Sequence, residues 1–196
     1  MPIDKSSPNP RPAERYGRIA QLLHWLTAIL VLVAFVYGPG GPEQRVYDPA
    51  RDFDRHLHET LGSCVFALTL LRIVWRRFDT RPAPQPAGAA MALAARAMQA
   101  GLYLLLLAVP LTAVAGAWLQ GHALAWLGGI EIAPPLAESH ALGTTLAALH
   151  GWLGDAIVWL AGLHALAALY HHVLLKDGVL TGMLPLALGR ALSRRR

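Results

Sequence analysis

The sequence predicts an all-α membrane protein, a bundle of four transmembrane helices. Of its 196 residues, 55% are apolar and only 15% are charged, and the mean hydropathy is positive, which is unusual for a soluble domain. The apolar residues gather in four runs, each close to the roughly 20 residues that a helix needs to cross a bilayer. Because backbone groups in lipid must hydrogen-bond within the membrane and no alternating barrel pattern is present, we expect helices.

The chain divides into a lead-in, a membrane domain and a tail. Residues 1–18 are polar, Pro-rich and basic, which predicts a flexible lead-in. The apolar run that follows is longer than that of a secretory signal and has no convincing cleavage site, so we interpret it as a retained span. Residues 19–185 form the membrane domain, and residues 186–196 form a basic cytoplasmic tail. The four spans are predicted at residues 19–37, 57–75, 97–119 and 149–175.

Two features between these limits bear on helix shape. Pro110 lies inside the third run and predicts a kink, which a neighbouring helix must cover. Residues 120–148 form a long connection with glycine and proline, predicted as a loop or a short interfacial helix. Its Trp126 and Leu127 suit an interfacial position.

Lysine and arginine set the predicted orientation. They are frequent in the lead-in, in the second connection and in the tail, but the third connection has none. By the positive-inside rule, both termini are cytoplasmic and the first and third connections face outward. The formal charge of +5 therefore indicates membrane topology rather than a nucleic-acid partner.

Four histidines fall at two predicted depths. His150 and His164 are fourteen residues apart, which on a helix is about 21 Å of rise and about 40° of rotation, so they share one face. His24 lies near the cytoplasmic start of the first span, and His58 opens the second span from the outside. Topology thus pairs His24 with His164 on the inner side and His58 with His150 on the outer side.

Paired imidazoles without carboxylates or thiolates favour six-coordinate haem over zinc. Cys64 is the only cysteine, which excludes a C-x-x-C-H attachment and makes any haem non-covalent. One alternative is that these histidines only hydrogen-bond across helices. Another is a histidine-based metal-ion carrier, which would lack intramembrane carboxylates to share the charge.

Two further residues are candidates for the inner site. Arg72 follows His58 by fourteen residues, so it returns to that face at the inner depth, where it could bind a haem propionate; the alternative is an arginine that snorkels to the interface. His171 lies seven residues beyond His164. It could contact a propionate or a quinone headgroup or transfer protons, or be an ordinary interfacial histidine.

Three motifs resemble the bacterial cytochrome b561 family. They are LLHWLTA around His24, RHLHETLG around His58, and GLHALAALYHHVLLKDGVL from Gly162 to Leu180. The resemblance covers roughly residues 16–185. It implies a multi-pass protein of the bacterial inner membrane that binds two b haems, with His24 and His164 on the inner iron and His58 and His150 on the outer iron.

The family also implies single-electron transfer between a periplasmic-side donor and membrane ubiquinone. Some relatives are proposed to oxidise superoxide, which needs a cationic approach; Arg45, Arg51 and Arg55 lie in the first connection, but acidic residues intersperse them. The alternative is a membrane anchor for a periplasmic dehydrogenase or hydrogenase that docks on residues 121–148. The Gly- and Ala-rich third and fourth spans allow packing within one bundle or between two copies.

Overall fold

A computed structural model describes residues 15–79, 88–185 and 188. Most of the predicted lead-in and tail, and the middle of the second connection, lie outside the described residues, so the domain limits stay predictions. Four long helices dominate the structure: α1 (Arg18–Val36), α3 (Asp52–Trp75), α4 (Ala89–Leu119) and α5 (His140–Tyr170). With their short flanking turns, all four are long and apolar enough to cross a membrane. The predicted four-helix membrane fold is confirmed.

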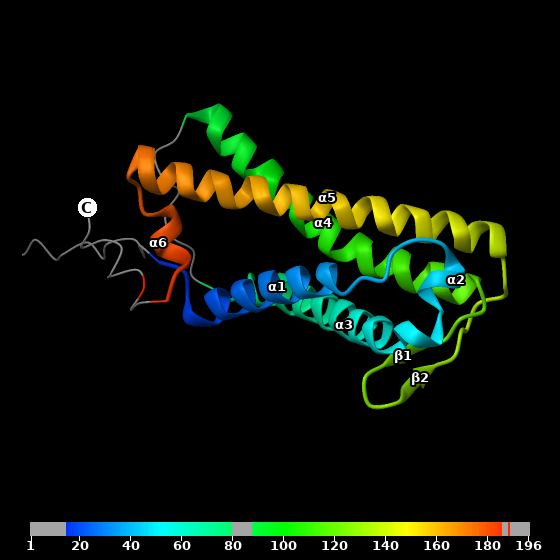
Figure 1. Cartoon of the computed structure of the whole chain (residues 1–196). Coiled ribbons are helices and arrows are strands. Elements are labelled where there is room, and N and C mark those ends of the chain that lie inside the picture. Colours follow the sequence, from blue (N-terminus) through cyan, green and yellow to red (C-terminus); the bar gives the residue numbers. More distant parts are fainter. Residues whose placement is uncertain (1–14, 80–87, 186–187, 189–196) are drawn as a thin grey trace, which may run out of the picture.

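The helices form two pairs. α1 packs chiefly against α3, and α4 packs against α5, so that Figure 1 shows the two pairs side by side along one long axis. Gly116 and Gly143 allow the second pair to approach closely, because a Cβ on Gly116 would lie 3.1 Å from the Ala147 nitrogen and one on Gly143 would lie 2.7 Å from Gln120 Cγ. These two glycines therefore serve packing within one bundle.

Three helices begin earlier than predicted. α3 begins at Asp52 rather than residue 57, α4 at Ala89 rather than residue 97, and α5 at His140 rather than residue 149. Hydropathy marks only the part of a helix that lipid can surround, whereas alanine and several polar residues extend the same helix into the interface. α4 continues through Pro110.

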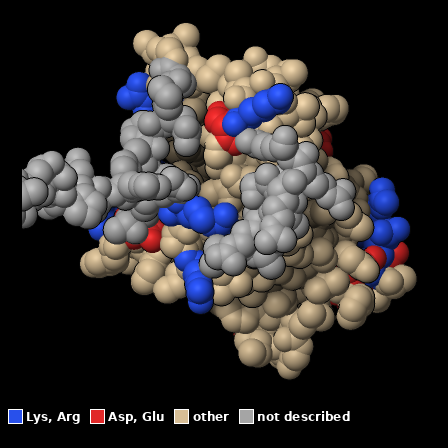
Figure 2. Space-filling model, turned by 90° about the vertical axis from the view of Figure 1, so that its left-hand side faces the viewer, with Lys and Arg blue, Asp and Glu red and all other residues tan. Residues whose placement is uncertain are grey.

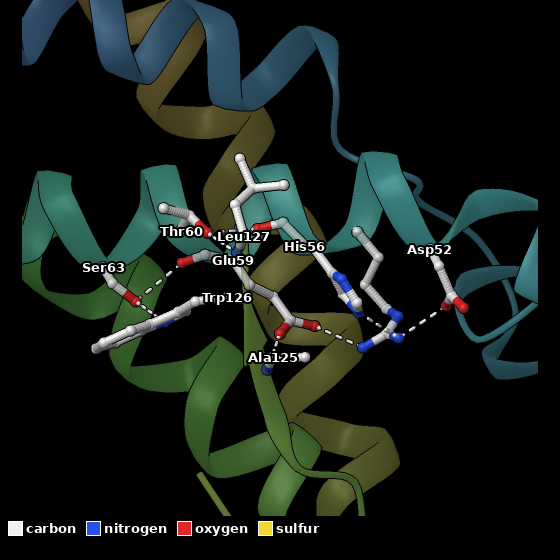
Figure 3. Close-up of polar contacts among 9 residues, drawn as sticks. Asp52, His56, Glu59, Thr60, Ser63, Ala125, Trp126 and Leu127 are labelled. Atoms are coloured by element: carbon white, nitrogen blue, oxygen red, sulfur yellow. Dashed lines mark hydrogen bonds and ion pairs between the residues drawn. The ribbon is translucent and has the colours of Figure 1, made fainter. Parts of the chain in front are cut away.

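The third connection is a β-hairpin, so the prediction of a short interfacial helix is wrong. Strands β1 (Leu124–Trp126) and β2 (Ile130–Ile132) pair antiparallel. Gly128 and Gly129 make the turn with φ of 93° and 79°, values that glycine adopts without a Cβ penalty. Side chains of α3 accept three hydrogen bonds from the hairpin, two from its backbone amides and one from the Trp126 indole (Figure 3).

The described ends of the chain meet at one end of the bundle (Figure 1). After α5, a π-helical turn (η2, His171–Leu175) leads to the short helix α6 (Val179–Met183). α6 packs on α1: Gln21 Nε2 donates to the Gly182 carbonyl at 2.9 Å, and Trp25 Nε1 donates to the Met183 carbonyl at 2.9 Å. Figure 2 looks onto this end and shows Lys and Arg side chains around it; that this end faces the cytoplasm stays a prediction.

The buried core is a small layer in the middle of the bundle. Val65, Leu106 and Ile157 form it. Val65 lies seven residues after His58, and Ile157 lies midway between His150 and His164, so this layer separates the two histidine depths. By contrast, Trp152 and Trp159 on α5 are 75% and 77% exposed, as expected for a surface that faces lipid.

Two shorter elements complete the first connection. α2 (Glu43–Val46) is a single turn, and η1 (Pro49–Arg51) leads directly into α3. The Asp48 carboxylate accepts from the Ala50 amide at 3.0 Å and caps that turn.

Candidate functional site

The outer histidine pair spans the two helix pairs. His58 on α3 and His150 on α5 face each other with ring centroids 5.9 Å apart and planes 86° apart. In a haem with two axial imidazoles, two iron–nitrogen bonds of about 2.0 Å, plus about 1.1 Å from each nitrogen to its ring centre, put the centroids about 6.2 Å apart. The observed separation fits a metal between the rings.

Both outer imidazoles are held by a backbone carbonyl of the neighbouring helix. His58 Nδ1 lies 2.7 Å from the Ala34 oxygen on α1, and His150 Nδ1 lies 2.9 Å from the Val109 oxygen on α4. A carbonyl can only accept, so each Nδ1 carries the proton and each Nε2 keeps a free lone pair. This arrangement orients metal-binding histidines and makes Nε2 a better ligand.

The inner pair has a similar separation. His24 on α1 and His164 on α5 have ring centroids 6.3 Å apart and planes 73° apart. The structure thus brings together the histidines that were paired by depth, and their role as iron ligands stays a prediction. Along α5 the two levels are about 21 Å apart.

A cavity of about 880 Å³ surrounds the outer pair. Gly62 and Gly154 line it, each four residues after one of the paired histidines. A Cβ built on either glycine would meet nothing within 4 Å, so neither serves helix packing, unlike Gly116 and Gly143. Beside each outer imidazole there is room for a planar group, and these residues fit a haem.

Other ligand arrangements are less suitable. In the part of the chain that the structure describes, no three His, Cys, Asp or Glu side chains come together as a metal site. Two opposed imidazoles instead suit a metal that brings its own equatorial ligands.

Arg72 lies at the inner pair, as its spacing predicted. Its Nη2 is 3.5 Å from His24 Nδ1, and its guanidinium carbon lies 5.4 Å from the centroid of the Tyr103 ring on α4. The side chain is therefore turned into the bundle rather than only toward the interface. Its contact with a propionate stays a prediction.

His171 is paired with an acid. Its Nδ1 lies 2.5 Å from Asp177 Oδ2, across the π-helical turn and the left-handed Lys176, whose φ is 53°. A carboxylate at Nδ1 orients an imidazole. This dyad lies at the inner end of the fourth span.

The outer end carries a cluster that sequence reasoning missed. His122 stacks on the Tyr47 ring with centroids 3.5 Å apart, and its Nε2 lies 2.7 Å from Glu43 Oε1. Burial, with the nearby Glu59 carboxylate, raises the pKa of Tyr47 to about 12. Glu43 and Tyr47 line the cavity. Glu43 and His122 are 79 positions apart, so no local motif could have found the pair.

The predicted cationic approach is partly neutralised. Arg55 Nη2 lies 2.8 Å from Asp52 Oδ1, and Arg55 Nη1 lies 3.4 Å from Glu59 Oε1. His56 Nε2 lies 3.0 Å from the same Arg55 Nη2, on the outer rim and apart from the histidine pair. Asp52 of this connection and Glu59 of α3 therefore pair with Arg55, the one arginine of the three that lines the cavity.

Comparison with known proteins agrees with these features. The prokaryotic cytochrome b561 family matches residues 15–186. The chain is 34% identical over 172 residues to cytochrome b561 homolog 2 of Escherichia coli, covering 87% of this chain and 92% of that protein. It is 31% identical over 176 residues to the probable superoxide oxidase CybB of Yersinia pestis (88% and 97%).

A third relative, cytochrome b562 of Cereibacter sphaeroides, is 33% identical over 175 residues, covering 86% of this chain and 94% of that protein. Together with the four apolar helices, these matches make the chain a multi-pass bacterial membrane protein with a role in electron transfer. It belongs to the prokaryotic cytochrome b561 family, whose members bind b-type haem.

Proposed function

We propose that this protein is a dihaem cytochrome of the bacterial inner membrane that carries single electrons between a donor on the periplasmic side and ubiquinone. The observation that carries the proposal is the pair of facing imidazoles at each of two depths, with centroids 5.9 Å and 6.3 Å apart. If bound at these levels, b haem would supply one-electron chemistry, with a potential that the histidines and their surroundings would set. The termini and the inner pair face the cytoplasm in this proposal.

The chain's own residues have distinct tasks. His58 and His150 hold the outer group and His24 and His164 the inner one, with the outer rings oriented by the Ala34 and Val109 carbonyls. The apolar layer of Val65, Leu106 and Ile157 keeps water out between the two levels and leaves a low-dielectric separation.

The inner end suits quinone reduction, because a quinone takes up protons with its electrons. His171, oriented by Asp177, is the group that would deliver a proton there or contact a quinone oxygen, because an imidazole can both donate and accept a proton. Arg72, next to His24, would hold an inner propionate through a charge-assisted hydrogen bond.

For the donor we propose superoxide. Two observations support this proposal: the chain is 31% identical in sequence to a protein named probable superoxide oxidase, and a cavity lies at the outer histidine pair. Arg55 already forms ion pairs with two carboxylates. Attraction of the superoxide anion would therefore depend on the other two arginines of the first connection.

A second candidate is an electron-carrying anchor for a periplasmic redox subunit. The observation in its favour is the β-hairpin, whose second strand is exposed throughout, with Ile130 55% exposed. An apolar strand at the outer end offers a docking edge.

The test is a reduced-minus-oxidised spectrum of the detergent-purified protein with a haem count, followed by a superoxide pulse in the presence of ubiquinone. Two b haems per chain and fast reduction by superoxide would support the first candidate. Two b haems that ignore superoxide, with a co-purifying subunit that reduces them, would favour the second. A folded preparation without haem would overturn both.

A further inference from the structure

Two buried donors in the outer cavity have no partner in the part of the chain that the structure describes. Arg55 Nε and Trp118 Nε1 are buried and make no hydrogen bond, and both residues line the cavity that contains His58 and His150. An unpaired buried N–H is costly, so such groups in a native protein call for a missing partner. Two of them at one cavity indicate an acceptor that the cavity holds.

The contacts of Arg55 leave its Nε unused. Asp52 and Glu59 occupy its two Nη groups, and its guanidinium carbon lies 5.3 Å from the Tyr47 ring centroid. Glu59 is itself fixed by the β-hairpin, because its Oε2 accepts from the Ala125 amide at 2.6 Å (Figure 3). The guanidinium is thus held from three sides and Nε remains free to donate.

Trp118 differs from the other tryptophan of this cavity. Trp126 also lines it, but its Nε1 donates to Ser63 Oγ at 3.0 Å (Figure 3). A buried indole N–H normally has such a partner. Trp118 therefore differs from Trp126 in its unused donor, which makes Trp126 a matched control.

Both donors lie on the outward side of the histidine pair. Arg55 is one helical turn nearer the outer end of α3 than His58. Trp118 follows Val109, whose carbonyl holds His150, toward the outer end of α4. A group held by the histidines would meet these donors only along its outward edge.

We propose that Arg55 Nε and Trp118 Nε1 bind the propionate carboxylates of the haem held by His58 and His150, so that the propionates face the outer surface. This inference rests on the proposed dihaem function. Carboxylates are the acceptors that a buried guanidinium binds best. Substitution of Arg55 would also disturb its ion pairs with Asp52 and Glu59. Substitution of Trp118 removes an uncharged donor with no other hydrogen bond, so it tests the propionate contact more directly.

The experiment compares Trp118→Phe, Arg55→Lys and the control Trp126→Phe in the full-length, haem-loaded protein. Loss of one hydrogen bond to a charged group corresponds to about a tenfold weaker interaction. We therefore expect Trp118→Phe to transfer its outer haem to apomyoglobin about tenfold faster and to lower the outer-haem potential, with the inner-haem signal unchanged as a check on folding. Resonance Raman bands of the outer propionates should shift in Trp118→Phe and Arg55→Lys but not in Trp126→Phe.

Identical outer-haem transfer, potential and propionate bands in Trp118→Phe and Trp126→Phe would overturn the inference while leaving two haems and the proposed function intact. Unchanged haem signals with slower reduction by superoxide would assign the donors to the small anion instead and would equally overturn it. Wild-type protein with no outer haem would refute the proposed function itself.

Discussion

Substitution of Gly154 by a larger residue tests the cavity, because it should stabilise the helix while it weakens haem binding. Gly154 lies inside α5, where glycine is about 1 kcal/mol less favourable than alanine. Nothing lies within 4 Å of a Cβ built there, so the protein alone should accommodate Gly154→Ala and gain up to about 1 kcal/mol in the stability of its haem-free form. A Gly154→Leu side chain would instead project into the cavity beside His150.

The assay measures haem content and thermal unfolding together. We expect Gly154→Leu to fall from two haems per chain to one, with the outer signal lost, while its haem-free form unfolds at or above the wild-type temperature. The control is Gly162→Leu on the same helix, where a Cβ also meets nothing within 4 Å but the site is outside the cavity lining. Gly154→Leu with two haems, or Gly162→Leu with one, would refute the reasoning.

The remaining predictions concern the histidines and the polar contacts around them. Alanine at either residue of a histidine pair should remove one haem and leave the other, as counted by haemochrome and by split reduced-minus-oxidised bands; different bands lost within one pair would contradict the pairing of His24 with His164 and of His58 with His150. Arg72→Ala should lower the inner-haem potential by about 60 mV, the equivalent of one charge-assisted hydrogen bond, and an unchanged redox titration would argue against a propionate contact. Glu59→Gln should weaken the hairpin by about 1–2 kcal/mol, seen as faster hydrogen exchange at the Ala125 amide, with the α1 amides as an internal control. Because the pKa of Tyr47 is raised from 10.0 to about 12, the folded state holds this proton more tightly, and the stability it contributes is lost as pH rises from about 10 to about 12; Tyr47→Phe should flatten that part of the pH–stability curve.

Much of the architecture was predictable because a bilayer allows few solutions. Lipid requires helices of about 20 residues, and a regular helix turns the fourteen-residue spacing of His150 and His164 into one face at two depths by arithmetic. The same arithmetic located Arg72 at the inner pair, where it lies 3.5 Å from His24. Local periodicity and membrane topology were sufficient for these results.

Contacts between distant segments were not predictable from the sequence alone. Ala34 and Val109 orient the outer imidazoles through backbone carbonyls, a group that every residue carries and that no side-chain pattern marks. The sequence does not distinguish Gly62 from Gly116, yet Gly62 lines a cavity and Gly116 permits close helix contact. The difference depends on the neighbouring helix. His122 meets Glu43 only because the hairpin folds back on α3. Spacing along one helix follows from its rise and twist, whereas the partner across a gap depends on how separate helices pack.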